Sequence, residues 1–217
     1  MFRRSLVFIF LLFNLFFTQQ ECGATILINE FLADPPVGLE GDANRDGVTS
    51  NKDDEFVEIV NFGNTLIDIS NWYLKDNVAV RHIFAPNTLL GPLECLVIFG
   101  GGNPSGFDVK VVVSSSGELS LNNNGDVISL FDSNNHLIDQ VIYGSEGGKD
   151  QSLTRYPDGS GTWQLHTLLN QGNILRYSPG RRTDGQPFKT AVPEPCSALG
   201  LVIGTLALVF KKKISKE

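Results

Sequence analysis

The sequence predicts an all-β fold, and three observations support that prediction. Short runs of β-branched and aromatic residues, several of them alternating with polar residues, recur between residues 26 and 166. Clusters of Gly, Pro, Asn and Asp separate these runs at short intervals. No long window has the period of about 3.6 residues that marks an amphipathic helix. Short strands with such regular turns are typical of a β-sandwich or a β-barrel.

The expected strands follow one another along the middle of the chain. They are residues 26–32, 55–61, 67–69, 72–74, 81–84, 95–99, 109–113, 127–131, 137–143, 152–156 and 162–166. The clearest turns between them are residues 61–64, 100–104, 122–126 and 132–135. After Gly144 the sequence is more polar, and residues 170–188 are expected to cross the domain surface and lead into a linker. We therefore expect one domain at 25–188, about 165 residues, which is long enough to bury a good core.

The first 24 residues have the pattern of a secretory signal peptide. Arg3 and Arg4 form the positive end, residues 6–17 form an almost unbroken apolar run, and Cys22-Gly23-Ala24 supplies small residues for cleavage. An uncleaved N-terminal anchor is the alternative. A lipoprotein signal fits less well, because the residues before Cys22 are polar.

A second apolar run, residues 196–210, precedes the lysine cluster at residues 211–213. As a helix this run would be about 22 Å long, short of the roughly 30 Å hydrocarbon core of a membrane. Lysine side chains can reach the membrane surface and make up part of the difference, and they favour the cytoplasmic side. We therefore expect residues 196–217 to form a short transmembrane helix that serves as a marginal or temporary anchor.

The composition of the expected domain limits its function. Residues 25–188 contain 21 acidic and 10 basic residues, a formal charge of −11. This charge argues against binding nucleic acid through its phosphates and is compatible with binding a cation. Cys95 is the one cysteine in residues 25–188, so no internal disulfide is expected. Its apolar neighbours predict a buried strand thiol rather than a catalytic nucleophile.

Residues 42–53 carry the strongest signal for a binding site. Calcium takes six to eight oxygen ligands, and oxygen-bearing residues at alternate positions of a tight turn can converge on one ion. Gly47 permits the turn, and Ser50 can hold a bridging water. The predicted ligands are Asp42, Asn44, Asp46, the backbone carbonyl of Val48, and Asp53.

The loop resembles the calcium loop of dockerins, which also has Asp at its twelfth position. Here, however, no helix is expected before Asp42, and a strand is expected after the loop. We therefore predict a structural Ca²⁺ site in an insertion between two strands, where the ion would hold a long connection in place. The alternative is a solvated acidic loop that binds nothing specifically.

Other candidate sites are weaker. The glycines at 100–102 lack the following Gly-Lys-Ser/Thr of a phosphate-binding loop, and His82, His136 and His166 do not have zinc-type spacing. Trp72 and Trp163 are most simply core aromatics. Glu30 and Glu58 lie in apolar strands, where they either face solvent or add carboxylates near the calcium loop. No catalytic motif is present, so no catalytic residue and no organic cofactor are predicted.

The order of motifs along the domain resembles a lamin tail domain in its bacterial extracellular form. The segments that carry the resemblance are residues 28–36 (INEFLADPP), 41–47 (GDANRDG), 54–61 (DEFVEIVN), 68–74 (DISNWYL), 81–84 (RHIF), 97–102 (VIFGGG), 119–126 (LSLNNNGD), 150–155 (DQSLTR) and 178–180 (SPG). The resemblance implies an immunoglobulin-like β-sandwich that acts as a binding or structural module and is not itself catalytic. It leaves the ligand open.

The C-terminal end resembles a PEP-CTERM sorting signal. Pro193-Glu194-Pro195 closes a linker at residues 189–195, and the apolar run and the lysine cluster follow in the expected order. The resemblance implies recognition by an exosortase-type enzyme, loss of the tail, and release or attachment at the cell surface. An ordinary single-span tail anchor is the alternative.

These features together predict a non-catalytic, exported cell-surface or extracellular-matrix protein that is stabilised by calcium. Its expected partners are signal peptidase, an exosortase-type enzyme, the membrane at least transiently, and an extracellular polysaccharide, with no role for nucleic acid. A carbohydrate- or polymer-binding module is the alternative function. A hydrolase has the least support, because no motif for one is present.

Overall fold

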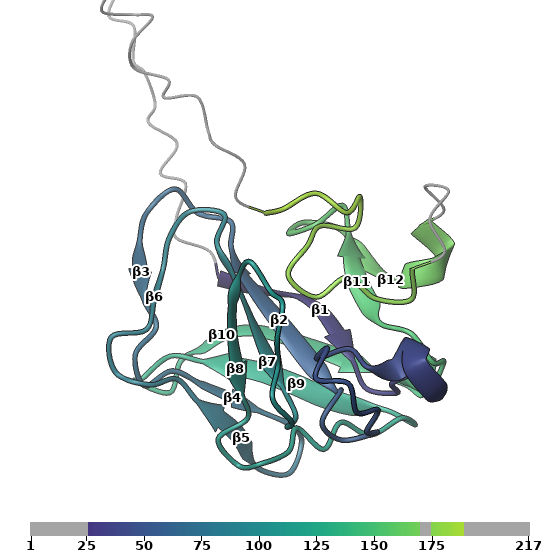
Figure 1. Cartoon of the computed structure of the whole chain (residues 1–217). Coiled ribbons are helices and arrows are strands. Elements are labelled where there is room, and N and C mark those ends of the chain that lie inside the picture. The colour runs from purple at the N-terminus through teal and green to yellow at the C-terminus, as the bar shows by residue number, and fades with distance from the viewer. Residues whose placement is uncertain (1–25, 170–174, 189–217) are drawn as a thin grey trace, which may run out of the picture.

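A computed structural model describes residues 26–169 and 175–188. Within these residues the chain forms strands and short 3-10 helices and no α-helix, as Figure 1 shows. The predicted signal peptide, the 189–195 linker and the sorting segment lie outside the described residues. None of the described helices is long and apolar enough to span a membrane.

Two sheets pack against each other, and a small third sheet lies at one end (Figure 1). The six-stranded sheet has the order β12-β11-β1-β2-β7-β8, and all its pairs are antiparallel except β7 with β8. Its strands are β12 (Thr162–Leu165), β11 (Leu153–Tyr156), β1 (Ile26–Leu32), β2 (Phe56–Asn61), β7 (Cys95–Phe99) and β8 (Lys110–Val113).

The second sheet is antiparallel and has four strands in the order β10-β9-β4-β5. These are β10 (Leu137–Tyr143), β9 (Asp126–Phe131), β4 (Tyr73–Lys75) and β5 (Val80–Ile83). The third sheet pairs β3 (Ile67–Asp68) with β6 (Leu89–Leu90). The 3-10 helices are η1 (Gly38–Gly41), η2 (Ser145–Gly147) and η3 (His166–Leu169).

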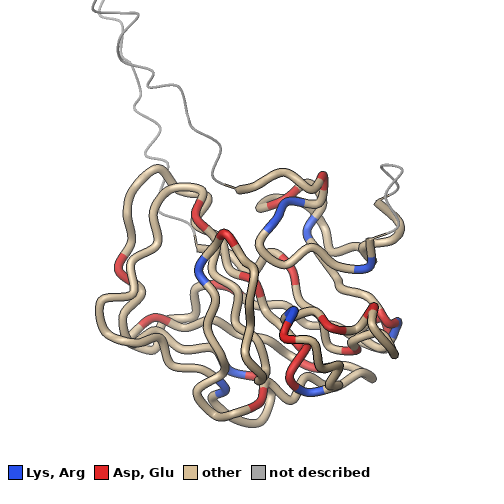
Figure 2. Tube along the Cα trace, viewed as in Figure 1, with Lys and Arg blue, Asp and Glu red and all other residues tan. Residues whose placement is uncertain are grey.

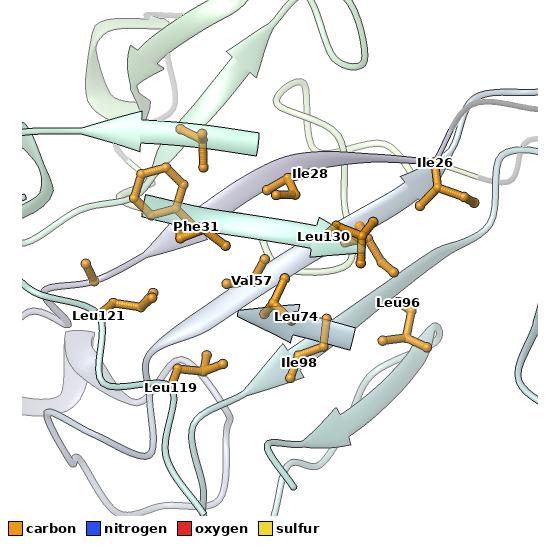
Figure 3. Close-up of a cluster of buried hydrophobic side chains, with 14 of the residues drawn as sticks. Ile26, Ile28, Phe31, Val57, Leu74, Leu96, Ile98, Leu119, Leu121 and Leu130 are labelled. Carbon is orange, nitrogen blue, oxygen red and sulfur yellow. The ribbon is translucent and has the colours of Figure 1, made fainter. Parts of the chain in front are cut away.

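The hydrophobic core fills the space between the two large sheets (Figure 3). Ile28, Phe31 and Val57 point into it from the six-stranded sheet, and Leu74 and Leu130 from the opposing sheet. Each of these side chains is at most 1% exposed. Because alternate residues of a strand face opposite sides, the apolar positions noted in the sequence become one buried layer. The expectation of a β-sandwich is therefore confirmed.

Most expected strands form, with boundaries shifted by one or two residues. β6 and the three 3-10 helices were not predicted, because they are too short to show a periodic pattern of apolar residues. The prediction that Trp72 begins a strand was wrong: Trp72 donates its backbone N–H to Ile69 in a turn, and β4 begins one residue later. Trp72 and Trp163 pack against the core as expected, and Cys95 is buried in β7.

Candidate functional site

The acidic loop at residues 42–54 connects η1 to β2 at one end of the sandwich. This region is dark blue in Figure 1, and its acidic residues are the red segments of the tube in Figure 2. No described helix longer than the 3-10 turn η1 precedes Asp42, and a strand follows the loop. The expected insertion between two strands is therefore present.

The first half of the loop is a tight turn organised by its own side chains. The Asp42 carboxylate accepts the backbone N–H groups of Asp46 at 3.1 Å and Gly47 at 3.0 Å. The Asn44 amide oxygen also accepts the Asp46 N–H, at 3.0 Å. Gly47 has a φ of 88°, which a residue with a side chain rarely adopts. The turn therefore gathers Asp42, Asn44 and Asp46, three of the predicted ligands.

The Asp46 carboxylate remains strongly acidic. The backbone N–H groups of Asn103 and Val48 donate to it, each at 2.9 Å, and these hydrogen bonds lower its pKa below the ordinary value. Val48 contributes this N–H, and its side chain is exposed. Asp46 is therefore a carboxylate that stays ionised at the surface of the loop.

Asp54, which is not among the predicted ligands, holds the second half of the loop in place. Its carboxylate accepts the backbone N–H groups of Asn44 at 3.0 Å and Ser50 at 2.7 Å, and burial raises its pKa. The neighbouring Asp53 carboxylate accepts no hydrogen bond from another described residue. Ser50 uses its hydroxyl to accept the Asp53 N–H at 3.1 Å. Asp54 thus holds the loop together, and Asp53 is left available as a ligand.

The glycines at 100–102 pack directly against the acidic loop. A Cβ atom at Gly101 would lie 2.1 Å from the Asp53 carboxylate, and one at Gly102 would lie 2.4 Å from both Asn44 and Asp46. Asn44 also donates to the Gly101 carbonyl at 3.4 Å. The glycine run was expected to be a plain turn. It also packs against three of the predicted ligands: Gly101 lies against Asp53, and Gly102 lies against Asn44 and Asp46.

No group of three or more His, Cys, Asp or Glu side chains lies close enough to hold a metal ion among residues 26–169 and 175–188. Three of the predicted ligands, Asp42, Asp46 and Asp53, are carboxylates, so the structure does not bring all three of them together at one point. Calcium at this loop stays a prediction.

Glu30 and Glu58 form a second acidic site inside the domain. They lie opposite each other on β1 and β2, and both are 0% exposed. Neither of the two expectations from the sequence was correct, because these carboxylates face neither solvent nor the calcium loop. A bulge between Ile28 and Glu30 shifts the register there and interrupts the simple alternation of the strand.

Polar groups from distant segments surround the two carboxylates. Glu30 accepts hydrogen bonds from the Ser152 hydroxyl and from the N–H and hydroxyl of Ser178, each at 2.7 Å. Glu58 accepts the Gly180 N–H at 2.8 Å and the Asn29 amide at 3.2 Å. The whole set, called the clasp below, comprises Asn29, Glu30, Glu58, Ser152, Asp158, His166, Ser178 and Gly180.

The clasp contains a serine, a histidine and a glutamate, but it is not arranged as a catalytic triad. Ser178 lies between His166, whose Nε2 is 3.0 Å away, and Glu30. In a triad the histidine lies between the acid and the nucleophile. Ser178 and His166 are each only 6% exposed, and the open hollow lined by Gln151, Arg176 and Tyr177 is lined by neither of them.

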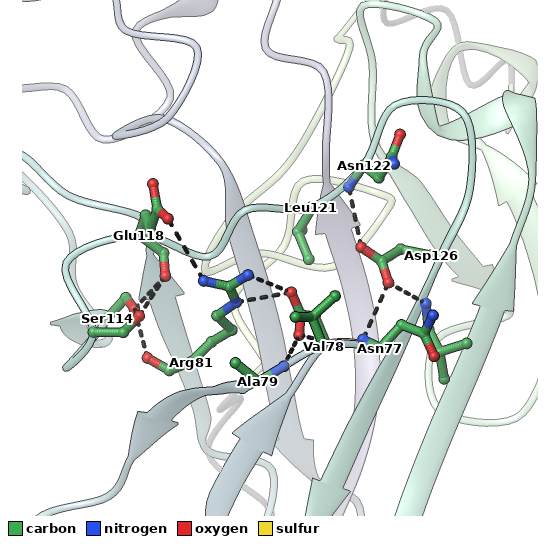
Figure 4. Close-up of polar contacts among 12 residues, drawn as sticks. Asn77, Val78, Ala79, Arg81, Ser114, Glu118, Leu121, Asn122 and Asp126 are labelled. Carbon is green, nitrogen blue, oxygen red and sulfur yellow. Dashed lines mark hydrogen bonds and ion pairs between the residues drawn. The ribbon is translucent and has the colours of Figure 1, made fainter.

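A third acidic group, Asp76, is compensated by a cation. Its carboxylate lies 2.7 Å from an Arg81 guanidinium nitrogen and accepts the backbone N–H of Val78 at 2.7 Å. Figure 4 shows Arg81 between this network and Glu118. Although burial opposes it, the hydrogen bonds from Ala79, Arg81 and Val78 lower the pKa of Asp76. This network ties the β4–β5 hairpin to the segment that carries Glu118.

The histidines do not share a site. His82 is buried on β5 and accepts the Ser115 N–H at 3.2 Å, whereas His136 is exposed in a turn beside Asp132. His166 belongs to the clasp. His82 therefore lies on a strand, His136 in a turn and His166 in η3.

The fold is a β-sandwich of the immunoglobulin-like kind. The lamin tail domain family matches residues 19–145, more than half of the 217-residue chain. This chain therefore belongs to the lamin tail domain family. A search of curated proteins found no match. The family match ends before β11 and β12, which complete the six-stranded sheet, and before the segment that closes the clasp.

Proposed function

We propose that this protein is an exported, non-catalytic structural or binding module of the cell surface or extracellular matrix, with a calcium ion bracing its acidic loop. The observation that carries the calcium part is the packing of the Asp46 and Asp53 carboxylates on Gly101 and Gly102. Calcium prefers such hard oxygen ligands. Asp42, Asn44, Asp46, the Val48 carbonyl and Asp53 would hold it, and the ion would brace the long connection between β1 and β2.

Export is supported by the two terminal segments. The signal-peptide pattern at 1–24 accounts for secretion, and the Pro193-Glu194-Pro195 motif with its apolar run accounts for sorting at the membrane. The acidic composition of the domain suits a soluble module outside the cell.

Export and sorting can be tested together in cells that produce the full-length chain. We expect protease added to intact cells to digest the domain, and the mature N-terminus to follow Ala24. Glu194→Ala should leave the chain in the membrane fraction, whereas Glu146→Ala, an exposed acid within the domain, should behave as native. Recovery of the native domain only from the cytoplasm would refute the proposal.

Polysaccharide binding is a second candidate, favoured by the outer face of the four-stranded sheet. Leu74 and Leu130 point into the core, so their strand neighbours Tyr73 and Phe131 face outward, and their rings stack 5.0 Å apart. Ile83 and Leu137, both about half exposed, extend this row across the sheet.

Aromatic rings beside polar groups can hold the apolar faces of sugars. We expect Tyr73→Ala to abolish retention of the full-length chain on an extracellular polysaccharide from its own cells. Val78→Ala, which removes an exposed side chain from the β4–β5 turn, should have no effect. Equal retention of both variants would exclude this face as the binding site.

A further inference from the structure

Residues 175–188, called the strap below, cross the β1–β2 pair and are fastened to it by the clasp. Ser178 gives two of its hydrogen bonds to Glu30, and the Gly180 N–H binds Glu58. Farther along, the N–H and hydroxyl of Thr183 bind Asp158 at 3.3 and 3.0 Å. The strap is thus attached largely through carboxylates.

The two central carboxylates have no cationic partner among the described residues. Arg155 pairs with Asp139, and Arg182 donates to the Phe188 carbonyl. The other titratable groups near Glu58 are Glu30 on β1, Asp158 in the β11–β12 connection and Cys95 on β7. The imidazole of His166 reaches Glu30 only through Ser178.

Burial and the adjacent Glu30 carboxylate therefore raise the pKa of Glu58 well above its ordinary value. The buried pair therefore favours the protonated, neutral form of Glu58. When alkali removes that proton, two negative charges would lie side by side without water. Solvating them requires the strap to lift, because β1 and β2 are held by ladders on both sides.

We propose that the strap is a pH-released latch, closed while Glu58 carries its proton and opened when that proton is lost to base. The direction of the pH effect follows from the raised pKa: an acid that is harder to ionise in the closed state stabilises that state at low pH. This stabilisation of the closed state is lost as the pH rises through the pKa of Glu58 in the folded protein. Opening would lengthen the connection between the sandwich and the predicted linker at residue 189.

The latch can be tested by limited trypsin digestion of the full-length chain in detergent, with calcium held constant. The strap contains three trypsin sites, Arg176, Arg181 and Arg182. Arg176 is exposed in the closed state, so the readout is cleavage after Arg181 or Arg182, and the exposed Lys149 serves as an internal reference for the protease. As the pH is raised from neutral into the alkaline range, we expect cleavage after Arg181 or Arg182, relative to cleavage after Lys149, to rise about tenfold or more.

Glu58→Gln removes the ionisation and should leave this ratio nearly constant with pH. Glu146→Gln, at an exposed acid, should behave as native. A constant ratio in the native chain, or the same rise in Glu58→Gln, would overturn the proposal.

A measurement on the native chain covers the case in which Glu58→Gln fails to fold. Infrared spectra should show the carbonyl band of a protonated carboxyl at neutral pH. The band should disappear over the pH range in which the strap becomes cleavable. A native chain without that band at neutral pH would also overturn the proposal.

Discussion

The acidic loop and the clasp both gather carboxylates, but they stabilise them in different ways. In the loop, Asp46 lies near the surface, backbone N–H groups surround it, and its pKa is lowered. In the clasp, Glu58 is fully buried beside a second acid, and its pKa is raised. The comparison shows two opposite effects: hydrogen bonds favour the ionised form of Asp46, whereas burial beside Glu30 favours the protonated form of Glu58.

Asp76 shows a third solution, in which the protein supplies the cation itself. We expect Arg81→Met to lower the free energy of unfolding by about 3 kcal/mol, because it leaves a buried carboxylate without its partner. Chemical denaturation measures this. Lys52→Met removes a surface pair with Glu118 and should cost less than about 1 kcal/mol. Equal costs for the two variants would show that Asp76 does not depend on Arg81.

His82 extends the comparison of buried titratable groups to acid pH. Burial lowers its pKa to about 4, so the folded state resists a proton that the unfolded chain accepts. Stability from this group is fully present above about pH 6.5 and is lost as pH falls from there through about 4, by up to roughly 3 kcal/mol.

The His82 contribution can be measured as the melting temperature across this pH range. His82→Gln should reduce the fall in melting temperature at acid pH and leave the pH-dependent opening of the strap unchanged. If the melting temperature of the variant falls at acid pH as much as that of the native chain, other groups cause the fall.

A substitution at Gly101 tests the packing of the glycine run against the acidic loop. Gly101→Ala places a methyl group where the Asp53 carboxylate lies, and we expect a cost of about 1 kcal/mol together with weaker calcium binding. Calorimetric titration with calcium measures the binding. Gly91→Ala, whose new methyl group would meet only the flexible Glu94 side chain at 3.3 Å, is the matched control. Unchanged calcium binding in Gly101→Ala would remove Asp53 from the ligand set.

Much of the fold could be predicted from the sequence, because alternation and turn residues are local signals. The same is true of the 42–47 turn, where Asp42, Asn44 and Gly47 act within a few residues of one another. The packing of Gly101 on Asp53 could not be predicted, since it joins segments that are distant in the chain. The clasp was missed for the same reason: Glu30 meets Ser178 across 148 positions, and the strap covers the face of the sheet on which Glu30 and Glu58 lie.

The central claim, that calcium braces the acidic loop, is tested most directly by thermal unfolding of the full-length chain in excess calcium and in chelator. A ligand that binds only the folded state raises the melting temperature by mass action. We predict a rise of several degrees for the native chain and none for Asp46→Asn, which keeps the shape of the side chain and removes its charge. No rise in the native chain, or the same rise in both, would contradict the claim.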